Sequence, residues 1–214
     1  MAQKSTTVMG SVFIVGADRA VVDTFKKEGF QIAETEEESD AVVFTGGSDI
    51  FPFIYGERPL KGCYYNVKRD LEEIKLLKTL PSGLPKIGIC RGGQLLNLFC
   101  GGSMFQDVDN HKSGVHPVKD LVTQNIIELN TVHHQMMIPG DQAFVVACAR
   151  AASYKHSESA RISYTDKGRE AWDDPEVLFY PGFNALCFQA HPENSHEETR
   201  KYFFDLLDIY YPKP

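Results

Sequence analysis

The chain has 214 residues, of which 43% are hydrophobic and 24% are charged, and its formal net charge at pH 7 is −7. This composition is typical of a folded domain, and it excludes a disulfide-stapled miniprotein and a disordered chain. The acidic residues concentrate in Glu34–Glu38 and Asp173–Glu176, and no basic stripe is present. We therefore expect residues 1–214 to form one domain that has no nucleic-acid partner.

The cysteines and the N-terminal residues indicate in which cellular compartment the protein is expected. None of the five cysteines forms a CxxC pair, and their neighbours are apolar or glycine-rich: Cys63, Cys90, Cys100, Cys148 and Cys187. Residues 1–10 contain no apolar signal-peptide region, and no run approaches the ~18–20 apolar residues of a membrane span. Free thiols suit a reducing compartment, so we expect a cytoplasmic protein without membrane contact.

The first half of the chain predicts alternating strands and helices. Continuous apolar runs predict buried strands at Ser11–Val15, Ala41–Phe44 and Lys86–Ile89. Helical spacing predicts three helices. The first ends at Lys27, the second carries Leu71, Ile74, Leu77 and Leu80 on its apolar face, and the third runs from Arg91 to Cys100. This βαβ pattern indicates a parallel sheet.

The second half of the chain lacks this alternation of strands and helices. From about Val115 to Phe188, short β-rich runs predict antiparallel or mixed strands at Asn125–Leu129, Ala143–Ala149, Arg161–Tyr164 and Ala185–Gln189. The last segment, His196 to Tyr211, has an apolar helical face. The sequence therefore predicts an α/β fold whose central sheet is largely parallel and has an antiparallel extension.

The most specific local motif is Gly88-Ile89-Cys90-Arg91-Gly92, a G-x-C-x-G between a strand and a helix. It is the thiol counterpart of the serine nucleophile elbow, in which glycines avoid collisions around a strained turn. The start of a helix also favours a thiolate and offers N–H groups to an oxyanion. We predict that Cys90 is a nucleophile and that the Arg91 backbone N–H is an oxyanion donor. A buried thiol beside a glycine-rich turn is the alternative.

A cysteine nucleophile needs a base and a group that orients the base. His191 and Glu193 follow the apolar run at Ala185–Ala190, so they are expected at the carboxyl edge of the sheet, beside Cys90. Taken alone, His-Pro-Glu is more often a surface turn. The pairing with the elbow favours a catalytic role.

Several motifs together resemble a known family. The order and spacing of Thr45-Gly46-Gly47, Gly88 to Gln94, Gly101-Gly102 and Gln189 to Glu193 are similar to those of class I glutamine amidotransferase domains. The resemblance implies a flavodoxin-like three-layer sandwich over residues 1–214. It also implies hydrolysis of glutamine or a γ-glutamyl conjugate without a cofactor.

The resemblance further implies roles for single residues. Cys90 is the expected nucleophile, His191 the general base and then acid, and Glu193 the carboxylate that fixes the imidazole tautomer. The expected oxyanion donors are Gly47 and Arg91. The expected substrate contacts are Gly46, Gln94 and His134.

The segment Gly46–Glu57, the pair Arg69-Asp70 and the arginine after Cys90 resemble the γ-glutamyl hydrolase branch, which includes enzymes that hydrolyse γ-glutamyl-aminobutyrate. Although these residues favour a hydrolase, the chain is short and has few pocket-building insertions, so it is expected to be a glutaminase that supplies ammonia to a synthetase on another chain. The alternatives are a free-standing γ-glutamyl hydrolase and an inactive binding or regulatory subunit.

Two further groups of residues have no predicted role in catalysis. No metal is expected, because amide hydrolysis by a thiol needs none and because no metal-site rule matches the spacing of Asp107, Asp109, His111 and His116. A solvated rim is expected from the basic residues Arg58, Lys61, Lys68 and Arg69.

Overall fold

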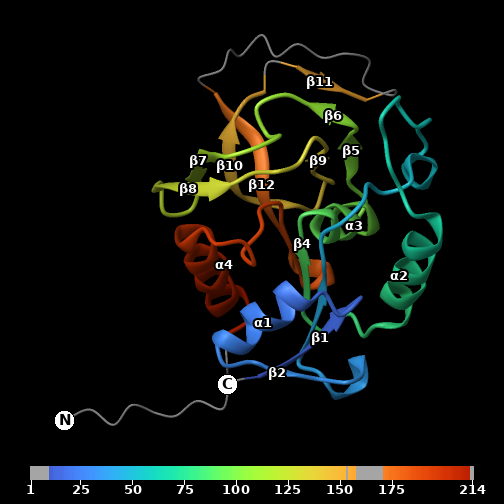
Figure 1. Ribbon diagram of the computed structural model, residues 1–214, viewed down its shortest axis with the longest axis vertical. Coiled ribbons are helices and arrows are strands. Elements are labelled where there is room, and N and C mark those ends of the chain that lie inside the picture. The colour runs from blue at the N-terminus through green and yellow to red at the C-terminus, as the bar shows by residue number, and fades with distance from the viewer. Residues whose placement is uncertain (1–9, 153, 158–170, 213–214) are drawn as a thin grey trace.

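The computed structural model describes residues 10–152, 154–157 and 171–212. Its frame is a nine-stranded sheet with the strand order β2-β1-β3-β4-β13-β12-β10-β7-β8 (Figure 1). The strand predicted at Arg161–Tyr164 lies outside the described residues.

The first five strands in this order are parallel to one another. Strands β3, β4 and β13 are buried along their whole length, as continuous apolar runs require. The bounds are β1 Ser11–Val15, β2 Gln31–Ile32, β3 Ala41–Phe44, β4 Lys86–Ile89 and β13 Ala185–Phe188.

The other four strands of the sheet are antiparallel to their neighbours. Their bounds are β7 Val115–Asp120, β8 Ile126–Asn130, β10 Phe144–Arg150 and β12 Trp172–Tyr180. Two small two-stranded sheets accompany this half, formed by β5 (Ser103–Phe105) with β9 (Met136–Ile138) and by β6 (Asp107–Val108) with β11 (Lys155–His156) (Figure 1).

Strand β12 was not predicted, although it lies between β13 and β10. Its sequence contains Asp173, Asp174, Pro175 and Glu176, which are depleted in strands. Although this run is acidic, Asp174 and Glu176 are fully buried. Pro175 lies opposite Cys148, next to a shift in the register between β10 and β12.

Helices cover both faces of the sheet (Figure 1). On one face, α1 (Arg19–Lys27) and α4 (Glu197–Tyr210) share a core in which the rings of Phe25 and Phe203 meet edge to face, 6.0 Å apart. On the other face, α2 (Val67–Thr79) and α3 (Arg91–Phe99) pack Leu77 and Leu95 against Phe44. This is the predicted three-layer α/β sandwich. Three short 3-10 helices complete it: η1 Glu36–Glu38, η2 Pro52–Tyr55 and η3 Pro181–Phe183.

Helix α2 differs from its prediction. It begins earlier than expected, after Asn66, whose side chain caps it by accepting a hydrogen bond from the N–H of Arg69. Leu71 was placed on the apolar face but is 57% exposed, whereas Asp70 and Glu73 are buried. The two carboxylates occupy this face because a buried arginine, described below, pairs with both.

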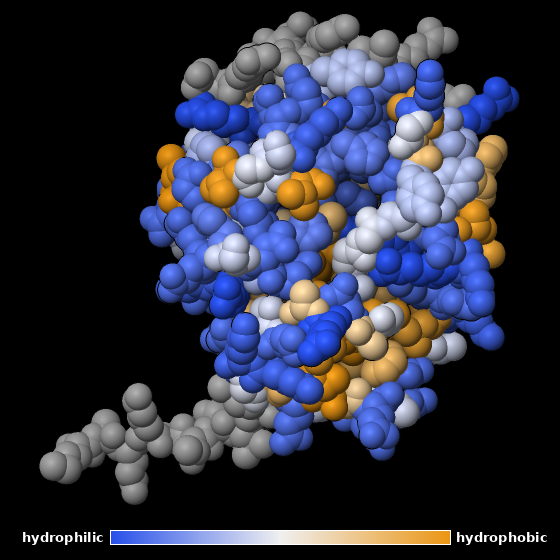
Figure 2. All heavy atoms as spheres, viewed as in Figure 1, coloured by the Kyte–Doolittle hydropathy of each residue, from blue (hydrophilic) through white to orange (hydrophobic). Residues whose placement is uncertain are grey.

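On the face shown in Figure 2, hydrophobic surface gathers over the lower, parallel half of the molecule, and the upper half is mostly hydrophilic. None of the helices in the described ranges is long and apolar enough to span a membrane.

Candidate active site

The predicted elbow is present where β4 runs directly into α3 at Cys90. This residue has φ 49° and ψ −112°, a strained conformation for a residue with a side chain. A Cβ at Gly88 would lie 2.5 Å from the carbonyl group of Gly92, and a Cβ at Gly92 would overlap the carbonyl of Phe44. The glycines are therefore required by the close packing of the elbow on its neighbours.

The two expected oxyanion donors flank this turn. Arg91 lies in the first turn of α3, where backbone N–H groups have no partner within the helix. Gly47 follows the end of β3 with φ 140°, and the guanidinium of Arg69 occupies the space that a side chain at Gly47 would need. Both backbones are placed as the sequence analysis expects, and their role in stabilising an oxyanion stays a prediction.

The structure brings His191 and Glu193 to the elbow, because β13 pairs with β4 in parallel register. The Nδ1 atom of His191 lies 2.7 Å from Glu193 Oε1. The imidazole also lies close enough to Cys90 for the thiol to raise the imidazole pKa. Gly46 fits between them, since a Cβ there would lie 3.0 Å from Cε1 of His191 and 3.8 Å from Cβ of Cys90. The thiol, imidazole and carboxylate thus form one continuous series.

Asn130 holds the backbone of His191 from both sides. Its Nδ2 donates to the His191 carbonyl at 2.7 Å, and its Oδ1 accepts from the His191 N–H at 2.8 Å. The sequence analysis missed this residue, because an asparagine at the end of a β-run is also typical of a turn.

The environment of His191 favours its charged form. Burial alone would lower the pKa of the imidazole, but hydrogen bonds and negative charge from Cys90 and Glu193 outweigh burial and raise the pKa to about 10. His191 is therefore an imidazolium at neutral pH, beside the Cys90 sulfur. Burial instead raises the pKa of the Cys63, Cys100 and Cys148 thiols to about 12, and it raises the pKa of the Cys187 thiol well above its ordinary value.

The side chain of Arg91 joins the elbow helix α3 to helix α2. It is 1% exposed and forms ion pairs with Asp70 and Glu73 of α2. Glu73 also accepts from Nε of Arg69 at 2.7 Å, and Nη1 of Arg69 donates to the Gly46 carbonyl at 2.9 Å. We call these four side chains, of Arg69, Asp70, Glu73 and Arg91, the arginine network. It links the elbow helix to the loop that carries the second expected oxyanion donor.

The expectation that Arg69 belongs to a solvated rim is therefore wrong, because its guanidinium is bound to the Thr45–Gly46 backbone. Arg58, Lys61 and Lys68 are exposed as expected.

The expected substrate contact Gln94 has its partners inside the protein. It is buried, and its Nε2 donates to Gln189 Oε1 at 3.2 Å and to the Gln135 carbonyl at 3.3 Å. Gln189 in turn places its Nε2 3.6 Å from the Cys90 sulfur. Gln94 thus contacts Gln189, the residue beside the Cys90 sulfur. A contact between Gln94 and a substrate stays a prediction.

His134 lies at a partly exposed rim. Its Nε2 is 3.0 Å from Asp49 Oδ1, and this hydrogen bond raises the pKa of the imidazole against the opposing effect of burial. It lines a cavity of about 450 Å³ together with Cys63, Gln106 and Tyr154. A contact between His134 and a substrate stays a prediction. A cavity of about 600 Å³ lies at the opposite, amino-terminal edge of the parallel strands, away from Cys90.

The four residues weighed as metal ligands do not come together as a set. Asp107 pairs with Lys112 at 3.0 Å, and Asp109 accepts from the N–H of Tyr154. His111 and His116 instead meet two residues that the sequence analysis missed, His133 and Glu176. These four residues, His111, His116, His133 and Glu176, are called the histidine cluster below. They come from separate parts of the chain, so no local spacing could have revealed the cluster.

Known proteins share this architecture. A protein from Thermoplasma acidophilum, described as part of a GMP synthase, superposes with a TM-score of 0.66 at 16% identity, over 94% of each chain. A relative from Mycobacterium tuberculosis, named as a glutamine amidotransferase, is 31% identical over 166 residues, which are 75% of this chain and 52% of that protein. The carbamoyl phosphate synthase small chain of Pectobacterium atrosepticum is 29% identical over 143 residues, 64% of this chain and 33% of that protein.

The chain spans about half the length, or less, of the curated relatives it matches. The sequence profile of Peptidase C26 matches residues 16–154, a range that includes the elbow and both expected oxyanion donors. With these motifs in order on this fold, the chain belongs to the Peptidase C26 family and is a class I glutamine amidotransferase-like protein.

Proposed function

We propose that the protein hydrolyses a γ-glutamyl amide through a thioester on Cys90, and that the amide is glutamine. The ammonia released would serve a synthetase carried by another chain. The observation that carries this proposal is the continuous series from Glu193 through His191 to Cys90 at a strained strand-to-helix turn. Such a series is the arrangement of an activated nucleophile.

In the first step, the Cys90 thiolate attacks the γ-carbonyl carbon of glutamine and the carbonyl oxygen becomes an oxyanion. The backbone N–H groups of Gly47 and Arg91 would donate to this oxygen, and each such donor contributes about 3–4 kcal/mol of transition-state stabilisation. The carbon–nitrogen bond then breaks, and the leaving nitrogen takes the proton of the His191 imidazolium. Ammonia departs, and the γ-glutamyl group remains on sulfur.

In the second step, neutral His191 takes a proton from water, and the water oxygen attacks the thioester carbonyl. The carbon–sulfur bond breaks, glutamate leaves, and the thiolate and imidazolium are restored. Glu193 holds the Nδ1 side of the ring, so that Nε2 faces the sulfur in both steps.

The relatives support a partner chain. One of them is named as the small chain of carbamoyl phosphate synthase, and a structural neighbour is described as a subunit of GMP synthase. Both names denote one component of a larger synthase. A free-standing γ-glutamyl hydrolase is the second candidate, and the match to a peptidase family favours it.

An assay of the isolated protein with glutamine, γ-glutamyl-aminobutyrate and a γ-glutamyl peptide separates the two. A partner-dependent glutaminase should cleave glutamine slowly and the two conjugates no faster, because closure of its site awaits the synthetase. Cleavage of one conjugate with kcat/KM near ~10⁴ M⁻¹s⁻¹, while glutamine stays poor, contradicts the partner-dependent function and supports the free-standing hydrolase. The Cys90→Ser protein is the control for contaminating activity.

A further inference from the structure

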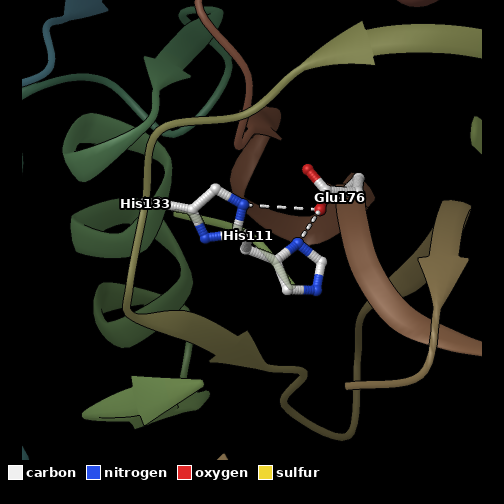
Figure 3. Close-up of side chains that lie close together, drawn as sticks. All are labelled: His111, His133 and Glu176. Atoms are coloured by element: carbon white, nitrogen blue, oxygen red, sulfur yellow. Dashed lines mark ion pairs between the residues drawn. The ribbon is translucent and has the colours of Figure 1, made fainter. Parts of the chain in front are cut away.

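The histidine cluster lies in the antiparallel half of the molecule, outside the Cys90 site. His111 precedes β7, His116 lies on β7, His133 lies between β8 and β9, and Glu176 lies on β12. All four are buried or nearly so, and the side chains of His111 and Glu176 are 0% and 1% exposed. Figure 3 shows the rings of His111 and His133 turned toward the carboxylate of Glu176.

The imidazole nitrogens converge on one carboxylate oxygen. Glu176 Oε1 lies 3.1 Å from Nδ1 of His111, 3.4 Å from Nε2 of His116 and 3.4 Å from Nε2 of His133. Despite these distances, none of the three nitrogens has a hydrogen-bond partner of good geometry, and neither has either oxygen of Glu176. Buried polar atoms of native proteins are almost always paired, so a group of unpaired ones requires an explanation.

The outer nitrogens of two rings are already bound. Nε2 of His111 lies 2.9 Å from Asp174 Oδ2, and Nδ1 of His133 lies 2.7 Å from the carbonyl oxygen of Gln135. Each acceptor fixes the N–H of a neutral ring on the outside, so the lone pair of the other nitrogen faces Glu176. Lone pairs that face a carboxylate repel it unless a cation lies between them.

No lysine or arginine side chain is paired with Glu176 among the residues that the structure describes. The nearby ammonium of Lys155 is paired with Asp174, and the ion pairs of Glu176 are with the three imidazoles. A single proton on His111, whose Nδ1 lies 3.1 Å from Glu176 Oε1, would neutralise Glu176. It would leave the inner nitrogens of His116 and His133 unpaired.

We propose that the histidine cluster binds one Zn²⁺ ion through His111 Nδ1, His133 Nε2 and Glu176, with His116 Nε2 beside them, 3.4 Å from Glu176 Oε1. Ligand atoms on a tetrahedral zinc with bonds of about 2.0–2.1 Å lie about 3.3–3.4 Å apart. The separations of Glu176 Oε1 from His111 Nδ1 and His133 Nε2, 3.1 and 3.4 Å, match this spacing. The inner atoms of His111, His133 and Glu176 all lie within 4.8 Å of one another, close enough to surround one ion.

The donor set favours zinc over magnesium and calcium. Those two ions take oxygen ligands, whereas imidazole nitrogen with one carboxylate suits zinc. His111, His133 and Glu176 are buried, so a substrate has no access to the ion and the site is structural. The inference departs from the expectation that the chain binds no metal.

The zinc would hold one wall of the Cys90 site. The Gln135 carbonyl accepts from His133 Nδ1 and also from Gln94 Nε2. Gln94 donates to Gln189, which contacts the Cys90 sulfur. Binding at the cluster would therefore add a constraint to residues 131–135, in which Thr131 and His133 already bond to the carbonyl of His111.

The test uses the full chain without an affinity tag, stripped of metal and then titrated with Zn²⁺ and with Co²⁺ as a spectroscopic probe. We expect about one ion per chain, tetrahedral cobalt bands without a thiolate-to-cobalt band, and a Tm higher by about 5–15 °C in saturating zinc. Wild-type protein that binds neither ion, or that shows a thiolate band, overturns the proposal.

A His133→Gln variant and a matched His156→Gln control locate the ion. His156 lies on β11, where its Nδ1 meets the hydroxyl of Tyr154 outside the cluster. His133→Gln should lose the bound ion and the zinc-dependent rise in Tm, and His156→Gln should keep both. Equal binding by both variants overturns the assignment. If His133→Gln does not fold, the wild-type cobalt spectrum decides.

Discussion

Two buried charged groups flank the Cys90 site, and they differ in how their carboxylates are compensated. In the arginine network, Asp70 and Glu73 face the guanidinium groups of Arg69 and Arg91, and the side chains bond directly to one another. In the histidine cluster, the carboxylate of Glu176 faces imidazole nitrogens without a hydrogen bond of good geometry. A buried carboxylate requires a cation. One group contains its cations in the sequence, and the other requires a proton or a metal ion.

The two groups also support different walls of the site. The arginine network fixes the elbow helix against the Gly46–Gly47 loop, and so sets the distance between the two expected oxyanion donors. The histidine cluster constrains residues 131–135, which contact Gln94. Substitutions of Cys90 and its catalytic partners, substitutions in the arginine network and changes in the pKa of His191 should therefore have separable effects.

The largest effect should come from substitution of Cys90, which lies between the two walls of the site. Cys90→Ser should lower kcat by at least about 10³-fold, because an alcohol beside the same base is a much weaker nucleophile at neutral pH. Circular dichroism should be unchanged, since serine fits where the 7% exposed thiol lies. Retained turnover contradicts the role of Cys90, and loss of the fold indicates a structural thiol.

The two partners of Cys90 should rank in a fixed order. His191→Ala should cost more activity than Glu193→Gln, because the proton carrier has no substitute, whereas an amide still holds part of the ring's orientation. Comparison of kcat for the two variants at several pH values tests the order. A His191→Ala enzyme as active as wild type rules out the proposed series.

The arginine network should affect stability more than chemistry. Arg91→Met leaves Asp70 and Glu73 without their buried partner and should destabilise the fold by about 3–5 kcal/mol in denaturant unfolding. The matched control is Lys68→Met on α2, whose exposed ion pair with Glu72 contributes less than about 1 kcal/mol. Equal midpoints for the two variants would show that the network contributes little.

The smallest effect should be the titration of one imidazole. The pKa of His191 is raised to about 10 in the folded protein, above its ordinary value of 6.5. The associated stabilisation is therefore complete below about pH 6.5 and is lost as pH rises through about 10. Cys90→Ser removes one source of the raised pKa, so the His191 resonance in NMR should titrate at a lower pH than in wild type. An unchanged titration contradicts the contact between the two residues.

Local patterns in the sequence predicted much of the fold and the elbow. The apolar runs at Ala41–Phe44 and Lys86–Ile89 are buried strands, and the glycines around Cys90 lie where a side chain would collide with neighbouring backbone. These features depend on residues close together in the chain, so periodicity and spacing reveal them.

Features assembled from distant segments were not predictable in this way. Strand β12 contains buried Asp174 and Glu176, which look like surface residues unless Lys155 and the histidines are known to face them. Asn130 and Arg69 were missed or misassigned for the same reason, since each bonds to backbone more than twenty residues away.

The most direct test of the central claim is the order in which the cysteines react with a glutamine-like chloroketone. Labelled peptides, quantified by mass spectrometry over time in wild type and His191→Ala, give a rate for each thiol. Cys90 should react first and slow sharply without His191, because the imidazolium beside it favours the thiolate and burial raises the pKa of the other four thiols. Faster labelling of Cys63, or a Cys90 rate that does not depend on His191, would contradict the account.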